Sequence, residues 1–286
     1  MPIAAVLLVL GAAAGHAWWN YLAKGARIDA PFTYATVLVS LATLLPVAVA
    51  GYAVVRPDPG WEVVGLALVS GSLHTLYFWL LTQGYRVGDL SLVYPLSRGT
   101  GPVFAVIGGV LIFGERPSPV AVAGIMAVVA GAVLISLPRR VDVRQALPSV
   151  GFALATGTII ATYTLWDKNG VSLVTPVLYA FGIEAARTAI MGPYIAVSGD
   201  RRAGVARAFR EQTRAVLGVG ILTPLAYLLV LVAFTLAPVS YVAPAREISI
   251  LFGAAIGLRV LREEQPLRRA TGAAAIVGGV VALAFN

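Results

Sequence analysis

Apolar residues fall in long runs along this chain, and short polar segments separate the runs. A helix needs about 20 apolar residues to cross the roughly 30 Å hydrocarbon core of a bilayer. Each run reaches that length, so the pattern predicts an all-α integral membrane protein with ten transmembrane helices. The predicted spans are 2–22, 31–54, 61–85, 89–113, 118–137, 147–170, 175–197, 213–236, 239–261 and 266–285.

Composition favours the same class. The 286 residues are 59% hydrophobic and 12% charged, whereas a soluble domain carries about 25% charged residues. The first run has neither a basic start nor a small-residue cleavage site, so we expect a span rather than a signal peptide. The chain contains no cysteine, which excludes thiol catalysis, thiolate metal sites and disulfides. We expect a multi-pass protein of the cytoplasmic (inner) membrane.

Basic residues are distributed unevenly between the predicted loops. Loops that follow odd-numbered spans hold 14 Lys and Arg residues, five of them in the loop Arg201–Arg214, and the other loops hold three, Arg56, Arg116 and Lys168. The positive-inside rule then places the odd loops in the cytoplasm and both termini outside. Because this asymmetry accounts for most of the net charge of +8, the charge does not indicate a nucleic-acid partner.

A stretch in the first half of the chain recurs in the second half. Ser91–Pro117 and Ser240–Pro266 align at a constant offset of 149 residues, which matches a serine, two prolines, a glycine and a glutamate. Each half contains five predicted helices, an odd number, so the second half must enter the membrane from the opposite side. We therefore predict two inverted five-helix repeats, 1–138 and 147–286, joined by a linker at 139–146; many secondary transporters are built in this way.

Proline removes a backbone hydrogen-bond donor and bends a helix. Pro95 and Pro244 hold equivalent positions in the two copies of the recurring stretch. We therefore expect them to act as paired bends that let each half rock during gating.

Ionisable and aromatic residues within the spans are the candidates for a substrate site, because a charge in lipid is costly and usually marks a site. Helical spacing places several of them one turn apart on a shared face. The candidate substrate-binding residues are His16, Trp19, Asn20, His74, Tyr77, Phe78, Tyr94, Arg98, Tyr163, Trp166, Glu184, Arg187, Tyr227, Tyr241, Arg246 and Glu247. We expect no bound metal or cofactor.

Arg98 is the residue that we predict to contact the anionic end of the substrate. No acidic residue lies within one turn of it in its own helix, so an ion partner must come from another helix or from the substrate. Its equivalent in the second half is Glu247, of opposite sign. A plainer interpretation is that Arg98 snorkels to the membrane interface, just as His16, Trp19 and Asn20 could form an interfacial aromatic belt.

Other polar positions also have structural interpretations. Glu184 and Arg187 lie three residues apart and could form an ion pair within their helix. Asp167 and Lys168 lie near the end of the predicted span 147–170, where we expect them to form a solvated ion pair at the membrane edge.

Glycine spacing indicates close helix packing. Gly124 and Gly131 match Gly272 and Gly279 at a constant offset of 148 residues. Small residues at this spacing let helices approach closely.

The motifs PLSR and GERP around the fourth span, and APAREISILFG and EE around the ninth, resemble the EamA type of the drug/metabolite transporter superfamily. The resemblance covers essentially the whole chain. It implies a small-molecule transporter, often an exporter, whose cavity is lined by helices one, three, four, six, eight and nine and whose halves are joined by helices five and ten. The glycine spacing is similar to that of the small multidrug resistance family, whose members carry a proton-coupling glutamate in helix one. This chain has His16 and no carboxylate there, so coupling by that route is not expected.

We predict a monomeric secondary transporter, an exporter or exchanger, that works by alternating access in the lipid bilayer. No Walker A motif indicates ATP hydrolysis, and no HExxH or GxSxG motif indicates an enzyme. Three candidate arginines against two glutamates favour a small zwitterionic substrate such as an amino acid. A small organic anion, a phosphonate or phosphate ester, is the alternative, because arginine suits such groups. A cationic-drug efflux protein, a membrane-embedded enzyme and a scaffolding protein rank below these two.

Overall fold

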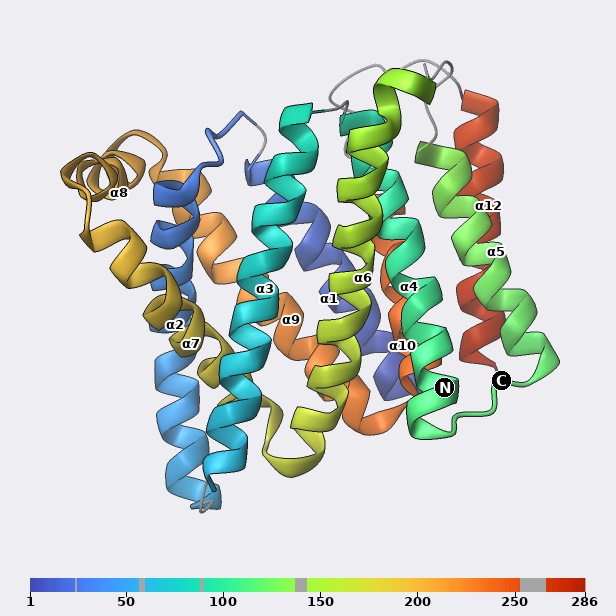
Figure 1. Ribbon diagram of the computed structural model, residues 1–286. Coiled ribbons are helices and arrows are strands. Elements are labelled where there is room, and N and C mark those ends of the chain that lie inside the picture. Colours follow the sequence, from blue (N-terminus) through green and yellow to red (C-terminus); the bar gives the residue numbers. More distant parts are fainter. Residues whose placement is uncertain (24, 57–59, 88–89, 137–142, 253–265, 286) are drawn as a thin grey trace.

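The computed structural model describes residues 1–23, 25–56, 60–87, 90–136, 143–252 and 266–285, and within them every regular element is helical (Figure 1). The elements are α1 (Ile3–Ala23), α2 (Ala30–Val55), α3 (Trp61–Val87), α4 (Leu90–Phe113), α5 (Pro119–Ser136), α6 (Val143–Leu173), α7 (Pro176–Ala196), α8 (Gly199–Glu211), α9 (Thr213–Leu236), α10 (Val239–Ala245), the 3₁₀ turn η1 (Arg246–Ile248) and α12 (Pro266–Ala284).

Six of these helices are long and apolar enough to cross a membrane, which makes the chain a multi-pass membrane protein by length and composition. They comprise α1, α2, α3, residues Leu96–Phe113 of α4, residues Leu147–Leu173 of α6, and α9. Two further helical segments, Pro119–Ile135 and Ala270–Ala284, are apolar but shorter. The helix boundaries agree with the predicted spans to within a few residues wherever both ends are described, although α6 begins at Val143, inside the predicted linker.

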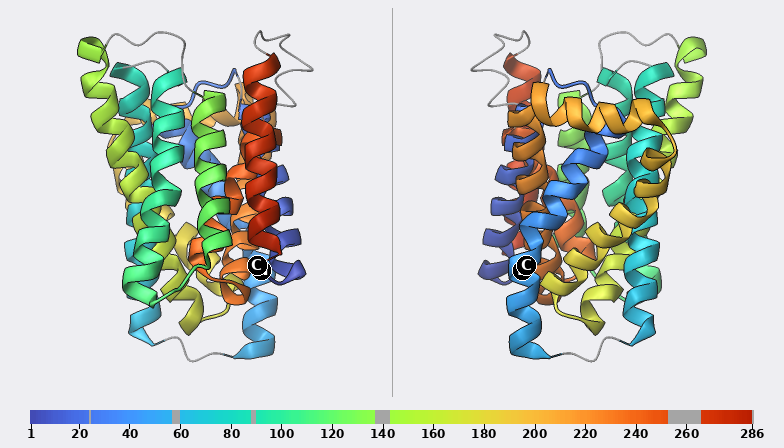
Figure 2. Two further views of the ribbon diagram at one scale, coloured as in Figure 1. Left: turned by 90° about the vertical axis from the view of Figure 1, so that its right-hand side faces the viewer. Right: turned by 90° about the vertical axis from the view of Figure 1, so that its left-hand side faces the viewer.

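Consecutive long helices run in opposite directions through the bundle (Figure 1). Helices distant in sequence form most of the packing, through the pairs α1 with α9, α4 with α6, α3 with α6, α2 with α7, and α5 with α12. The two chain ends meet at one end of the bundle, where the amino group of Met1 donates to the carbonyls of Leu283 and Ala284 at 3.2 Å. The short helix α8 lies crosswise at the opposite end (Figure 2).

The helix pair formed by α5 and α12 confirms the packing predicted from the glycines. A Cβ atom at Gly131 would lie 2.6 Å from the carbonyl oxygen of Gly272, and one at Gly272 would lie 2.9 Å from the carbonyl oxygen of Gly131. Gly124 and Gly279 face each other in the same way. The two backbones are therefore in direct contact, which larger side chains would prevent.

The segment predicted as a basic loop at 201–214 is instead largely helical, as α8. The hydroxyl of Ser198 accepts a hydrogen bond from the backbone N–H of Arg201 at 3.4 Å, which caps the first turn. Ala208 and Phe209 lie on the inner face and pack with Phe32 in an apolar cluster. The prediction missed the helix because the segment is rich in charged residues and its apolar face is narrow.

The predicted span 239–261 is not a single regular α-helix. The α-helix α10 changes at Arg246 to the 3₁₀ turn η1, directly after Pro244, and helical structure resumes at 249–252. The remainder, 253–261, lies outside the described residues. In the first half, α4 continues as an α-helix past position 95, so the two prolines occupy different local structures; the Pro95 side chain is outside the described part.

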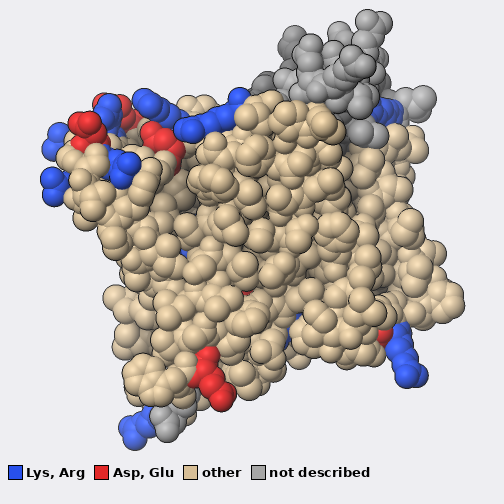
Figure 3. All heavy atoms as spheres, in the orientation of Figure 1, with Lys and Arg blue, Asp and Glu red and all other residues tan. Residues whose placement is uncertain are grey.

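Charged side chains gather at the two ends of the bundle, with the densest group over α8 (Figure 3). A broad band between the ends carries almost no charge on the face shown. This distribution matches a protein whose middle lies in hydrocarbon, with the basic end at one membrane surface.

Candidate functional site

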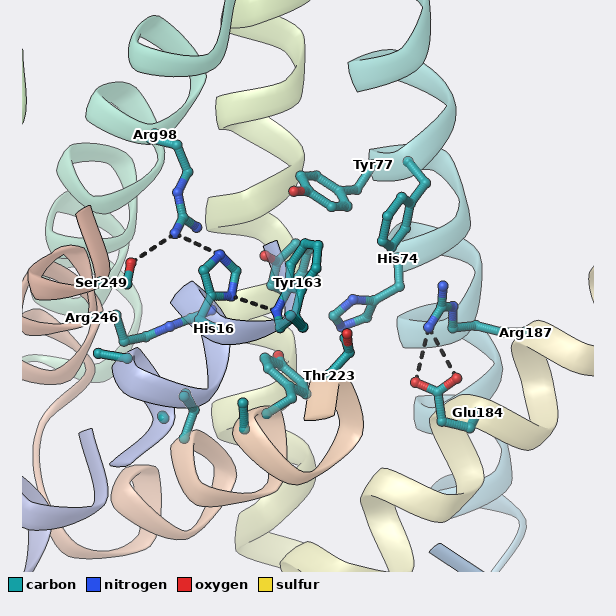
Figure 4. Close-up of a pocket in the computed structure, with 17 residues that line it drawn as sticks. His16, His74, Tyr77, Arg98, Tyr163, Glu184, Arg187, Thr223, Arg246 and Ser249 are labelled. Atoms are coloured by element: carbon teal, nitrogen blue, oxygen red, sulfur yellow. Dashed lines mark hydrogen bonds and ion pairs between the residues drawn. The ribbon is translucent and has the colours of Figure 1, made fainter. Parts of the chain in front are cut away.

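A cavity of about 80 Å³ lies inside the bundle among charged and aromatic side chains (Figure 4). Its lining comes from α1, α3, α4, α6, α7, α9, η1 and the helical residue Ser249 after it, so it includes the helices that the family resemblance implied and also α7. The lining residues are Ala12, Ala13, His16, Trp19, His74, Tyr77, Phe78, Arg98, Tyr163, Glu184, Arg187, Thr223, Ala226, Tyr227, Val230, Arg246 and Ser249. Eleven of them were predicted from the sequence.

Arg98 reaches from α4 into one side of the cavity and is only 6% exposed. Its terminal nitrogen Nη2 lies 3.0 Å from Nε2 of His16 and donates to the hydroxyl of Ser249 at 3.2 Å. Its Nε lies 3.5 Å from the Oε2 atom of Glu247. The ion partner thus comes from another helix, and Arg98 is buried in the bundle instead of snorkelling to its surface.

His16 receives two hydrogen-bond donors. The indole N–H of Trp19 points at its Nδ1 atom at 3.2 Å, while the Arg98 guanidinium points at its Nε2 atom. A neutral imidazole has one acceptor nitrogen, and indole and guanidinium groups are donors only. His16 can therefore accept from only one of them in a given tautomer.

Arg246 begins the 3₁₀ turn η1, two residues after Pro244, and points into the same side of the cavity. Its Cζ atom lies 5.7 Å from the ring centroid of Tyr227, and its guanidinium is beside the hydroxyl of Tyr163. Among the described residues no carboxylate lies within ion-pair distance of Arg246. It is therefore the guanidinium most available to a ligand.

The opposite side of the cavity holds the pair predicted on the seventh span. The Nη1 atom of Arg187 donates to both carboxylate oxygens of Glu184, at 2.9 and 3.0 Å, and both side chains are buried. The Arg187 guanidinium also lies 5.3 Å from the ring centroid of Phe78. Nearby, the hydroxyl of Thr223 has no hydrogen-bond partner in the described structure. The two interpretations of the pair are thus compatible, because it is an ion pair within the helix and it lines the cavity.

Aromatic rings separate these two sides (Figure 4). His74 stacks on Tyr163 with ring centroids 4.1 Å apart, and Tyr227 meets His74 edge-on at 5.0 Å. Tyr77 lies edge-on to Tyr163 at 6.0 Å. Their faces can hold the apolar part of a ligand or a cation.

Asp167 is the main polar residue that the sequence interpretation misplaced. It was expected to be solvated at the membrane edge, but it is fully buried and accepts hydrogen bonds from the hydroxyls of Tyr179, at 2.9 Å, and Tyr227. The adjacent Lys168 does not pair with it and instead donates to the carbonyls of Phe234 and, at 3.3 Å, Ala237. The predicted solvated pair is wrong because α6 continues to Leu173, which puts Asp167 inside the bundle. Its spacing four residues after Tyr163, on the same helix face, was the available signal.

Four predicted site residues do not line the cavity. The Asn20 side chain donates to the carbonyl of His16 at 2.7 Å, and the Trp166 indole donates to the carbonyl of Leu66 at 2.9 Å. Tyr241 packs against the apolar core, and Glu247 lies behind Arg98 as its ion partner. A fifth, Tyr94, has its side chain outside the described part.

The fold and the cavity define a multi-pass helical membrane protein with a buried polar site, an arrangement typical of small-molecule transporters. Residues 3–137, in the first half of the chain, match the model of the EamA-like transporter family, the family that the sequence resemblance predicted. The match supports a membrane transporter of small molecules. No curated protein matches the sequence at a significant level.

One solved structure, described only as "Crystal structure of protein", is similar to this chain with a TM-score of 0.76 and 18% sequence identity. The similarity covers 99% of this chain and 96% of the other. At this identity the similarity supports the fold alone, over both halves of the chain.

Proposed function

We propose that the protein is a secondary transporter, an exporter or exchanger, that moves a small zwitterionic metabolite such as an amino acid across the cytoplasmic membrane. The observation that carries this proposal is the charge arrangement of the buried cavity, with Arg98 and Arg246 on one side, the Glu184–Arg187 ion pair on the other and aromatic rings between them.

The ion pairs within the site leave one guanidinium in excess. Glu184 neutralises Arg187, and Glu247 lies at ion-pair distance from Arg98. Arg246 has no carboxylate at that distance among the described residues. Because an isolated charge in a low-dielectric cavity is costly, a ligand carboxylate that reaches Arg246 would bind favourably.

The other end of a zwitterion has partners across the cavity. Glu184 offers carboxylate oxygens, and the faces of Tyr163 and Tyr227 offer cation–π contacts to an ammonium group. A quaternary drug cation lacks the anionic group that Arg246 requires. The small volume of the cavity also suits a ligand of few heavy atoms.

Helix packing supports two inverted five-helix repeats that alternate access to the site. If α1 to α5 correspond in order to α6, α7, α9, α10 with η1, and α12, several of the main helix contacts have an equivalent in the other half. The contact of α1 with α9 then matches that of α6 with α3, and the contact of α3 with α7 matches that of α9 with α2. Such repeats exchange conformations around a site at their interface.

A small organic anion, a phosphonate or phosphate ester, is the second candidate. The excess guanidinium favours it, because arginine binds such groups with two parallel hydrogen bonds. The two candidates differ in whether the ligand needs an ammonium group at the Glu184 side.

Transport by purified protein in proteoliposomes tests the proposal. Counterflow of radiolabelled L-amino acids, of methylphosphonate and of tetraphenylphosphonium is measured in parallel, after a thermal-shift screen with the same compounds. Saturable counterflow of an amino acid is expected, with none of the lipophilic cation. Counterflow of methylphosphonate alone would favour the second candidate, and counterflow of the cation alone would reject both.

A further inference from the structure

A buried carboxylate that does not line the substrate cavity lies directly behind its aromatic wall. Asp167 is 0% exposed and is contacted from three other helices. The Tyr179 hydroxyl of α7 donates to its Oδ1 atom at 2.9 Å, and the Tyr227 hydroxyl of α9 donates to its Oδ2 atom. The Nε2 atom of His74, from α3, lies 3.2 Å from the same Oδ2 atom. The contacts fix the carboxylate in position without neutralising it, because both hydroxyl donors are uncharged.

In the part of the chain that the structure describes, the Asp167 carboxylate has one possible cationic partner. His74 is the only group there that can become cationic within ion-pair distance of it. Lys168 is next in sequence, but its ammonium group is bound to the carbonyls at the end of α9. A buried carboxylate without a cation is costly, so the pair is stable with one added proton.

Helices α6 and α7 and the turn η1 also bring charged or titratable groups close to the His74–Asp167 pair. On α6, Tyr163 stacks on the His74 ring. On α7, the Glu184–Arg187 pair lines the same cavity. On η1, the Arg246 guanidinium lies over the Tyr227 ring, 5.7 Å from its centroid.

His74 connects the carboxylate to the cavity. Its side chain is 12% exposed and lines the cavity, whereas the Asp167 side chain has no exposed surface. A carboxylate only accepts hydrogen bonds, so the Nε2 atom that faces it carries a hydrogen in both charge states. The nitrogen that can take up a proton is therefore Nδ1.

We propose that His74 and Asp167 form the proton-binding site that couples substrate transport to a proton gradient, an inference that rests on the proposed transport function. One proton passes from a hydronium ion in the cavity to Nδ1 of His74. An O–H bond of hydronium breaks, an N–H bond forms, water is released, and the charge of the pair changes from −1 to 0. After the cavity reopens on the other side of the membrane, the proton leaves to water there. A neutral pair costs less than an isolated carboxylate in a closed, dry cavity, so conformational exchange depends on the proton.

The first test does not require a known substrate. The chain has two histidines, His16 and His74, so full-length protein labelled with ¹⁵N-histidine in nanodiscs gives only two sets of ring signals, which His16→Gln assigns. In the parent, we expect the His74 signals to show protons on both ring nitrogens in the proton-loaded pair. In Asp167→Asn the ring should stay neutral, because its anionic partner is gone. Asp200→Asn, at an exposed position on α8, is the control and should behave like the parent.

The second test measures coupling in proteoliposomes with an equimolar mixture of radiolabelled L-amino acids and pyranine inside the vesicles. The parent should accumulate label when a pH gradient is imposed, with matching movement of protons. In Asp167→Asn and in His74→Gln, the ratio of gradient-driven uptake to counterflow should fall by about tenfold, a typical coupling between sites. Asp200→Asn should keep the parent's ratio.

Two results would overturn the assignment. One is an unchanged His74 titration in Asp167→Asn. The other is an equal loss of counterflow and gradient-driven uptake in both variants, which would make the pair part of the substrate site. If the parent transports none of the amino acids, the proposed substrate fails, and the NMR titration alone decides whether the proton site exists.

Discussion

The Arg98 guanidinium lies 3.5 Å from the Glu247 carboxylate, and the two residues hold the same position in the two copies of the recurring stretch. Equivalent positions of opposite sign thus meet inside the bundle and tie α4 to η1. Both side chains are buried, so each charge depends on the other for stabilisation. The substrate, if it binds Arg98, must compete with a protein carboxylate already in place.

Replacing Arg98 should affect both stability and binding. Arg98→Ala leaves the Glu247 carboxylate buried and unpaired, and we expect a loss of about 3–5 kcal/mol in the free energy of unfolding. Arg98→Lys keeps the positive charge but loses the planar guanidinium with its parallel N–H donors, so it should clearly weaken ligand binding. The double variant Arg98→Met with Glu247→Leu should recover much of the stability but not the binding. Thermal unfolding and ligand-binding measurements on the same preparations separate these effects, and tight binding by the double variant would make Arg98 a structural residue.

Arg246 should contribute to binding without a large contribution to stability. It lines the cavity and has no carboxylate partner among the described residues. Loss of a hydrogen bond to a charged group costs about 1.5–3 kcal/mol, so Arg246→Gln should weaken binding of an anionic or zwitterionic ligand by roughly 10- to 100-fold. Calorimetry on the purified protein measures this change. Arg214→Gln, at an exposed position, is the matched control, and equal affinity in all three proteins would remove Arg246 from the site.

Hydrophobic run length predicted most of the helix boundaries, because the lipid imposes a fixed span on each helix. It could not predict α8, whose narrow apolar face is set by contact with Phe32 rather than by a long run. Spacing along single helices identified the Glu184–Arg187 pair and most of the cavity wall.

Contacts between helices were less accessible from the sequence. The partner of Arg98 was limited to another helix or the substrate, but the spacing did not show that Glu247 reaches it. Asp167 was assigned to the membrane edge because its burial depends on tyrosines from two other helices, α7 and α9, which spacing along α6 does not reveal. Helical periodicity shows which residues share a face of one helix. It does not show which residues of four different helices meet in a cluster.

Two adjacent glycines in α12 should respond differently to the same substitution. A Cβ atom at Gly279 would lie 2.5 Å from the Gly124 carbonyl oxygen and 2.9 Å from the Val128 backbone nitrogen, whereas one at Gly278 meets nothing within 4 Å. Gly279→Ala should therefore destabilise the protein by about 1–3 kcal/mol, because backbone atoms must move apart. Gly278→Ala should leave thermal stability unchanged or slightly higher. Equal melting temperatures for the two variants would mean that the close contact between α5 and α12 is not maintained in solution.

The end of the bundle that carries α8 should face the cytoplasm. Five arginines lie in or beside this helix, at positions 201, 202, 207, 210 and 214, and the positive-inside rule retains such segments on the cytoplasmic side. The chain has no cysteine, so Ala206→Cys, at an exposed position of α8, supplies a single label site. A membrane-impermeant maleimide should label it in inverted vesicles but not in intact cells. Labelling from outside the cell would reverse the orientation and leave the fold as described.

Pro244 should control the rate of transport more than the affinity for substrate. It has no backbone N–H, so the Ser240 carbonyl cannot form the usual helical hydrogen bond to it, and the α-helix changes to the 3₁₀ turn directly afterwards. Pro244→Ala restores that donor and should stiffen the bend, which slows the exchange of conformations while equilibrium binding changes by no more than a few-fold. Pro46→Ala is the matched control, because Pro46 also lies inside a helix but is exposed and outside the cavity lining. Counterflow rates and binding isotherms are compared for the three proteins. A variant at 244 that loses binding but transports normally per bound substrate would place this proline in the site instead of the hinge.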